Sequence, residues 1–201
     1  MNPFPSRSPV VFRRSLASAT LIVLLAMQAA CTTVMPPPIA SGARSEALLA
    51  AKLPPTNVGT FRLAQGQPAL MDSELSGGLR GGNIAAPSGS FSQHLKDTLK
   101  AELQSAGLLD LRAKHVIEGQ LTDSKLDAAI GTGTARLAAR FQVLREGQVL
   151  FDKEVIADDS WDSSFVGAIA IPRAIEHYSG IYRLLVLKLL SDADFVQALK
   201  R

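Results

Sequence analysis

Cys31 has the most distinctive chemical setting in the sequence, because it is the only cysteine among 201 residues. It follows an apolar run of about a dozen residues and the small pair Ala29-Ala30, in a segment whose first half carries three arginines. A secretory signal typically has a positively charged start, a short apolar run and small residues before its cleavage site. The pattern predicts a signal over residues 1–30 and leaves one nucleophilic thiol directly after the cut.

The stretch Ala29-Ala30-Cys31 resembles the end of a bacterial lipobox, in which the cysteine becomes the acylated N-terminus. Gln28 departs from that pattern, because an aliphatic residue is usual there. An ordinary secretory signal and an uncleaved anchor are the alternatives, although the apolar run is shorter than the roughly 20 residues of a membrane span. We predict lipidation of Cys31, which also rules out disulfides. Thr32 rather than Asp after the cysteine favours the periplasmic face of the outer membrane.

The other residue types that could do chemistry lack the spacing that chemistry needs. His94, His115 and His177 form no H-x-x-x-H or H-E-x-x-H motif, and lipidation leaves no cysteine for zinc. The acidic run 158–162 lacks the calcium-loop pattern, and the glycine run 77–82 lacks the strand, helix and Lys-Ser pair of a phosphate loop. The sequence therefore predicts no catalytic centre, no metal and no cofactor.

The charge balance excludes a nucleic-acid partner. Three of the 21 basic residues precede Cys31, whereas none of the 18 acidic residues does. A mature chain without its leader is formally neutral and has no electrostatic footprint for nucleic acid.

The patterns after Cys31 predict a Pro-rich tether over residues 31–56 and a periplasmic α+β domain over 57–201. The first strand covers 57–64, and a glycine-rich loop over 65–90 leads to a helix over 91–106, which Ser90 and Gln93 fit as a capping box. Strands at 115–127, 132–144 and 149–157 show period-two alternation. A connection at 161–167 precedes a buried helix that starts near Pro172.

These elements give the order β-α-β-β-β-α. We expect a small antiparallel sheet of 3–5 strands with two helices packed on one face.

A partner-binding surface is expected at one end of this domain. The long loop carries apolar residues that are costly to expose, and the connection after the last strand carries the only tryptophan. The candidate contact residues are Leu79, Arg80, Ile84, Trp161 and Phe165.

Four segments taken in order resemble a known class of protein. They are the helix "FSQHLKDTLKAELQSAGLLD", the strand "IEGQLTDSKLD", the hairpin "ARFQVLREGQVLFDKEVIADD" and the closing "AIPRAIEHYSGIYRLLVLKLLSDADFVQAL". Over about 57–199 they resemble the ABC-type transport auxiliary lipoproteins and, more distantly, the lipopolysaccharide-assembly lipoprotein. The resemblance implies a lipid-anchored periplasmic α+β domain that serves a transport machine without catalysis. The long glycine loop departs from the pattern.

The expected function is that of a membrane-anchored, non-catalytic binding or accessory component of an envelope transport system. The alternative is a structural or assembly lipoprotein that braces an outer-membrane protein, and an envelope hydrolase is a remote third. The expected partners are the membrane, through the lipid anchor, and an envelope protein, either a transporter or a β-barrel.

Overall fold

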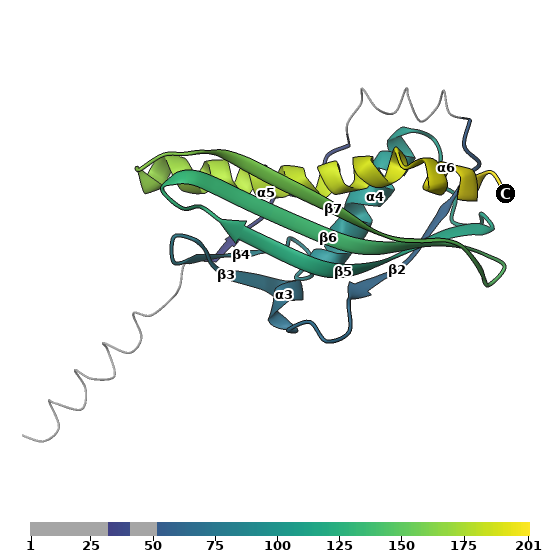
Figure 1. The fold of residues 1–201 in the computed structure, drawn as a ribbon, viewed down its shortest axis with the longest axis horizontal. Helices are drawn as coiled ribbons and strands as arrows, with labels where there is room; N and C mark the ends of the chain where they lie inside the picture. The colour runs from purple at the N-terminus through teal and green to yellow at the C-terminus, as the bar shows by residue number, and fades with distance from the viewer. Residues whose placement is uncertain (1–31, 41–51) are drawn as a thin grey trace, which may run out of the picture. The chain divides into compact units, whose positions relative to one another are not determined.

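The computed structural model describes residues 32–40 and 52–201, all of which belong to one compact unit, Thr32–Arg201. The predicted signal and Cys31 lie outside the described residues. Figure 1 shows the arrangement of the elements in this unit.

The main sheet has four strands in the order β2-β5-β6-β7, formed by β2 (Asn57–Leu63), β5 (His115–Asp127), β6 (Gly131–Arg145) and β7 (Gln148–Ser163). The last three are antiparallel neighbours, as their alternation predicted, and Glu146-Gly147 forms the tight turn with both φ angles positive. β2 instead pairs in parallel with β5, so the sheet is mixed. The expectation of an all-antiparallel sheet was wrong, because the crossover through α4 (Phe91–Ser105) returns the chain to the same end.

A second sheet, in the order β1-β4-β3, has two of its strands in the segment expected as a loop. It consists of β1 (Thr32–Val34), β3 (Glu74–Leu79) and β4 (Gly82–Ala85), with the short helix α3 (Leu70–Ser73) before β3. Arg80 and Gly81 have positive φ angles of 57° and 92°, which let the chain reverse between β3 and β4. The expected order of elements is therefore not confirmed, because the small sheet and the C-terminal helix α6 (Ala193–Leu199) add to it.

Residues at the start of the predicted tether belong to this small sheet. Thr32 pairs with Asn83, and the backbone N–H of Met35 donates to the carbonyl of Ala85 over 2.9 Å. The side chain of Met35 is buried in the core. The segment from Thr32 to Met35 is thus part of the folded domain.

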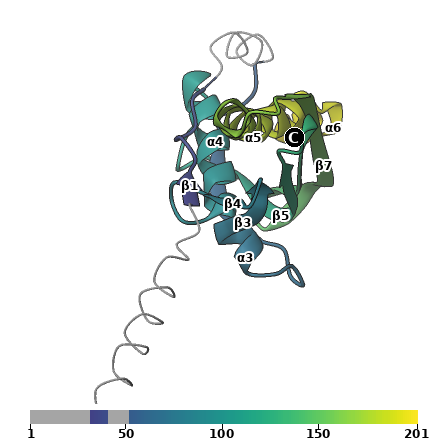
Figure 2. The ribbon, with the colours of Figure 1, turned by 90° about the vertical axis from the view of Figure 1, so that its left-hand side faces the viewer.

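The helices α4 and α5 (Gly167–Leu190) contact each other and pack on the main sheet, as Figure 2 shows. Ser90 caps α4 by accepting from the N–H of Gln93, which confirms that part of the predicted cap. The side chains that repeat every four residues along α4 and the inner residues of α5 are buried. The buried set includes Phe91, Leu95, Leu99, Leu103, Tyr178, Tyr182 and Leu185.

α5 begins five residues before Pro172, the residue where the sequence placed its start. A proline loses only the bond that its own N–H would make, here to the carbonyl of Ala168, and a helix tolerates that loss near its beginning.

Candidate functional site

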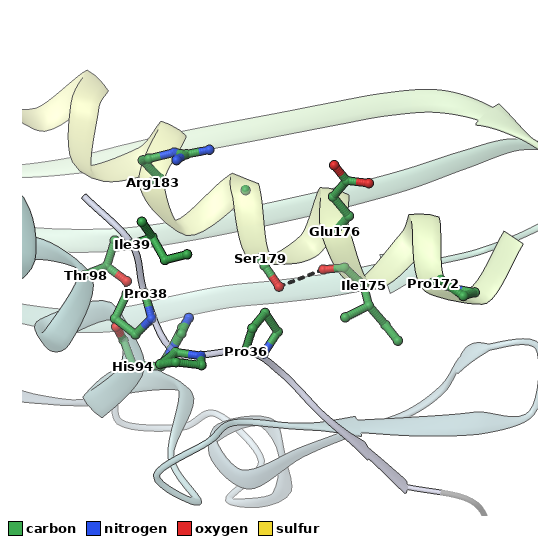
Figure 3. Close-up of a pocket in the computed structure, with 12 residues that line it drawn as sticks. Pro36, Pro38, Ile39, His94, Thr98, Pro172, Ile175, Glu176, Ser179 and Arg183 are labelled. Atoms are coloured by element: carbon green, nitrogen blue, oxygen red, sulfur yellow. Dashed lines mark hydrogen bonds between the residues drawn. The ribbon is translucent and has the colours of Figure 1, made fainter. Parts of the chain in front are cut away.

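A groove with a volume of about 340 Å³ lies between α4, α5 and the proline segment 36–39 (Figure 3). Prolines have no N–H to satisfy and favour an extended backbone, so the segment can cross the helices without a strand partner. Gly180 leaves open space on the α5 side, because a Cβ there would meet nothing within 4 Å. The lining residues are Pro36, Pro37, Pro38, Ile39, His94, Thr98, Pro172, Ile175, Glu176, Ser179, Gly180 and Arg183.

The hydroxyl groups of this groove are bonded to their own helices. Thr98 Oγ1 donates to the carbonyl of His94 over 2.8 Å, and Ser179 Oγ donates to the carbonyl of Ile175 over 2.7 Å. A hydroxyl that serves as a nucleophile instead needs a neighbouring base to take its proton. The groove is therefore better suited to holding an apolar group than to attacking one.

His94 is buried in the floor of the groove. Burial lowers the pKa of His94 to about 4, against a weaker opposing effect of Asp97, so the imidazole is neutral at neutral pH. Its ring meets the ring of Tyr182 edge-on with centroids 4.8 Å apart. His94 thus belongs to the packing of the groove floor.

A His–Asp pair lies beside α5 at a second, shallower hollow. His177 Nδ1 is 2.8 Å from Asp159 Oδ2, and the imidazole stacks on Trp161 with centroids 4.3 Å apart. Such a pair is the orienting half of a hydrolase triad. Within the described ranges, however, no hydroxyl or thiol is hydrogen-bonded to His177. The pair and the indole brace β7 against α5.

Three of the five predicted contact residues are buried. Leu79 and Ile84 belong to the core, and Trp161 lies within β7 rather than in a connection. Burial removes the reason for which they were proposed, because a partner cannot reach them. The acidic run before Trp161 continues the strand because Asp158 pairs with Arg136 on β6 over 2.7 Å.

The other two predicted residues come together at one end of the domain. Arg80 Nη1 donates to the carbonyl of Phe165 over 2.9 Å, and Nε donates to the carbonyl of Ala128 over 2.8 Å. Nη2 donates to the carbonyl of Ser164 and, over 3.2 Å, to Ser163 Oγ. Arg80 therefore joins the turn between β3 and β4 to two other connections.

Sequence reasoning missed the groove itself. The sequence signals for it were Gly180 in the interior of a helix and His94 on α4. The cover by segment 36–39 depends on contacts distant in sequence, which no local pattern shows. In residues 32–40 and 52–201, no group of three or more His, Cys, Asp or Glu side chains could hold a metal ion. No helix within these ranges has the length and apolar character needed to cross a membrane.

Comparison of the sequence with known protein families and with curated proteins finds no match. Among solved structures, the chain is similar to protein XCC0632 from Xanthomonas campestris, of the DUF330 family, with a TM-score of 0.52 and 11% identity over 79% of this chain and 94% of that chain. A candidate lipoprotein from Caulobacter crescentus gives a TM-score of 0.43 and 12% identity, over 78% and 97% of the two chains. The likeness to the Xanthomonas protein shows a shared fold.

Proposed function

We propose that the chain is a lipid-anchored, non-catalytic binding component of a bacterial envelope transport system. The leader and the lone cysteine support the anchor, and the resemblance of residues 57–199 to the transport auxiliary lipoproteins supports the transport role. The groove between α4 and α5 is the observation that carries the binding role. Its hydroxyls are bonded to backbone carbonyls, and its histidine is neutral.

The groove fits an apolar segment of a partner protein. Its volume of about 340 Å³ is at the lower end of the range for ligand pockets, which is roughly 300–1,000 Å³. Prolines and isoleucines supply the apolar walls, while Glu176 and Arg183 bring charges of both signs to the lining. Such a site favours an apolar anchor flanked by polar groups, which is the usual composition of a protein interface.

The anchor is tested by replacing the lipidated residue. Cys31→Ser should leave an unprocessed precursor or release the protein from the membrane, because the acyl chains supply the membrane affinity. Gel mobility, intact mass and membrane fractionation measure the outcome. Unchanged mature size together with unchanged membrane retention would contradict lipidation.

The binding role is tested by photocrosslinking in intact cells. A photoreactive amino acid in place of Arg183, which is exposed beside the groove, should form an adduct with an envelope transport protein. The matched control is the same amino acid in place of Gln148, which is exposed at the start of β7, next to the turn that follows β6. Gly180→Phe should abolish the adduct by filling the groove.

An adduct formed from position 148 but not from 183 would move the binding surface away from the groove. An adduct with an outer-membrane protein that has no transport role would favour the assembly alternative.

A further inference from the structure

The end of the domain where β6 begins carries an exposed apolar surface. Ile130, Phe165, Val166 and Ile169 have exposed fractions of 62%, 78%, 51% and 58%. We call these four side chains the apolar end. Large apolar side chains that are exposed together mark an interaction surface.

The connections that carry Ile130, Phe165 and Val166 are held together, and Ile169 follows in the first turn of α5. The guanidinium of Arg80 donates to the carbonyls of Ala128 and Phe165, so the two connections lie within the span of one planar group. Gly131, next to Ile130, pairs with Ser163 across the sheet. The apolar end is therefore one surface and not two separate loop tips.

The apolar end is also free of charged residues in its own segments. Residues 128–135 and 163–172 contain no Asp, Glu, Lys or Arg. The opposite end of the sheet differs, because Lys114 and Glu146 form an ion pair there over 2.8 Å and Arg145 contacts the C-terminal Arg201. The two ends therefore differ. Charged residues only border the apolar end, at Asp127, Asp162 and Arg173, whereas the opposite end has this ion pair beside the exposed side chains of Leu111 and Val149. The first arrangement suits an end that lies in a membrane interface.

The chain enters the domain at the apolar end. Thr32 pairs with Asn83, which is three residues from Arg80 and therefore within about 11 Å of it at 3.8 Å per residue. Thr32 lies on the strand next to Asn83, which adds the spacing between neighbouring strands, about 5 Å, to the distance between Thr32 and Arg80. In Figure 1 the turn between β3 and β4, the connection between β5 and β6 and the start of α5 lie at the same end, opposite the C-terminus.

We infer that the apolar end is a second membrane contact, seated in the interface of the bilayer that holds the acyl groups of Cys31. The inference rests on the proposed lipid anchor, because that anchor immediately precedes Thr32 and brings this end to the lipid surface. The acyl groups of Cys31 hold the chain at the bilayer but leave the domain free to rotate about them, and a second apolar contact fixes its orientation.

The test places an environment-sensitive fluorophore on the acylated full-length protein, reconstituted in vesicles of phosphatidylethanolamine and phosphatidylglycerol. Phe165→Cys carries the label at the apolar end, and Gln148→Cys carries it at the opposite end of the sheet. Acylation blocks the thiol of Cys31, and intact mass verifies it before labelling. Vesicles containing nitroxide-labelled lipid should quench the fluorophore about twofold at position 165, with a blue-shifted emission, and leave position 148 unchanged.

The remaining outcomes overturn the inference in distinguishable ways. An acylated protein with neither position quenched keeps its lipid anchor but has no second membrane contact. Equal quenching at both positions means that the domain lies on the membrane with another face. A blue shift at position 165 that occurs only at high protein density, without quenching by the labelled lipid, means that a second copy of this chain covers the apolar end. A mass without acyl groups rejects the anchor itself and, with it, the orientation.

Discussion

Replacing Arg80 by Ala should loosen one end of the domain at a measurable cost in stability. The side chain makes four hydrogen bonds, three of which are partly buried. At about 1–1.5 kcal/mol net for each partly buried bond, and with about 2 kcal/mol of rotamer entropy regained, the free energy of unfolding should fall by about 2 kcal/mol. For a domain of this size, that change lowers Tm by about 4–8 °C.

Thermal unfolding followed by circular dichroism measures the global effect, and hydrogen exchange measures the local one. Exchange should accelerate in residues 128–132 and 164–168, because the carbonyls of Ala128, Ser164 and Phe165 in these segments lose their donor. It should stay unchanged in the turn between β6 and β7. Arg80→Gly is the informative companion, because it removes the same bonds while relieving the positive φ of 57°. A Tm within 1 °C of the wild type in Arg80→Ala, with unchanged exchange, refutes the bracing role.

Three further changes test the packing and the groove. Gly133→Ala should destabilise the domain by about 1–3 kcal/mol in denaturant melts, because its Cβ would lie 2.3 Å from Trp161 Cε2; wild-type stability would contradict this contact. Gly180→Ala should instead stabilise by about 0.5–1 kcal/mol, since a Cβ there meets open space and alanine favours the helix; a loss of stability would show that the groove is filled.

The pKa of His94 is about 4 in the folded protein and 6.5 in the unfolded chain. Between these pH values the unfolded chain binds more protons than the folded protein. The free energy of unfolding should therefore fall as the pH drops from about 6.5 to about 4. His115, whose pKa burial also lowers, contributes with the same sign. His94→Phe should reduce this slope, and an unchanged slope would refute the assignment to His94.

Local pattern was sufficient to predict β5, β6, β7 and α4. Phe141 and Val143 alternate with polar neighbours and are buried, and Ser90 begins α4 as its spacing indicated. These elements are long, and each buries one face, so apolar residues recur along the sequence at the spacing of a strand or a helix. The direction of β2 depended on the crossover helix rather than on the residues of β2 itself.

The small sheet and the groove could not be predicted in the same way. β1 has three residues and pairs with a strand about fifty positions later, so the stretch around Thr32 carries no periodic signal. The prolines that follow are typical of an exposed spacer, yet they line the groove. Trp161 was misplaced because aspartates disfavour a strand locally, whereas the backbone pairing with β6 continues through them and Asp158 forms an ion pair with Arg136 across it.

The position of β1 also determines how far the protein can reach. A domain on a long flexible linker samples a hemisphere of positions above its attachment point, and a partner meets it at a correspondingly diluted local concentration. Here the first residue after Cys31 is already a strand residue, hydrogen-bonded into a sheet. For an acylated chain, the height of the α4–α5 groove above the bilayer is therefore set by the dimensions of the domain rather than by a linker. A partner anchored in a different membrane must bridge the remaining distance with its own structure.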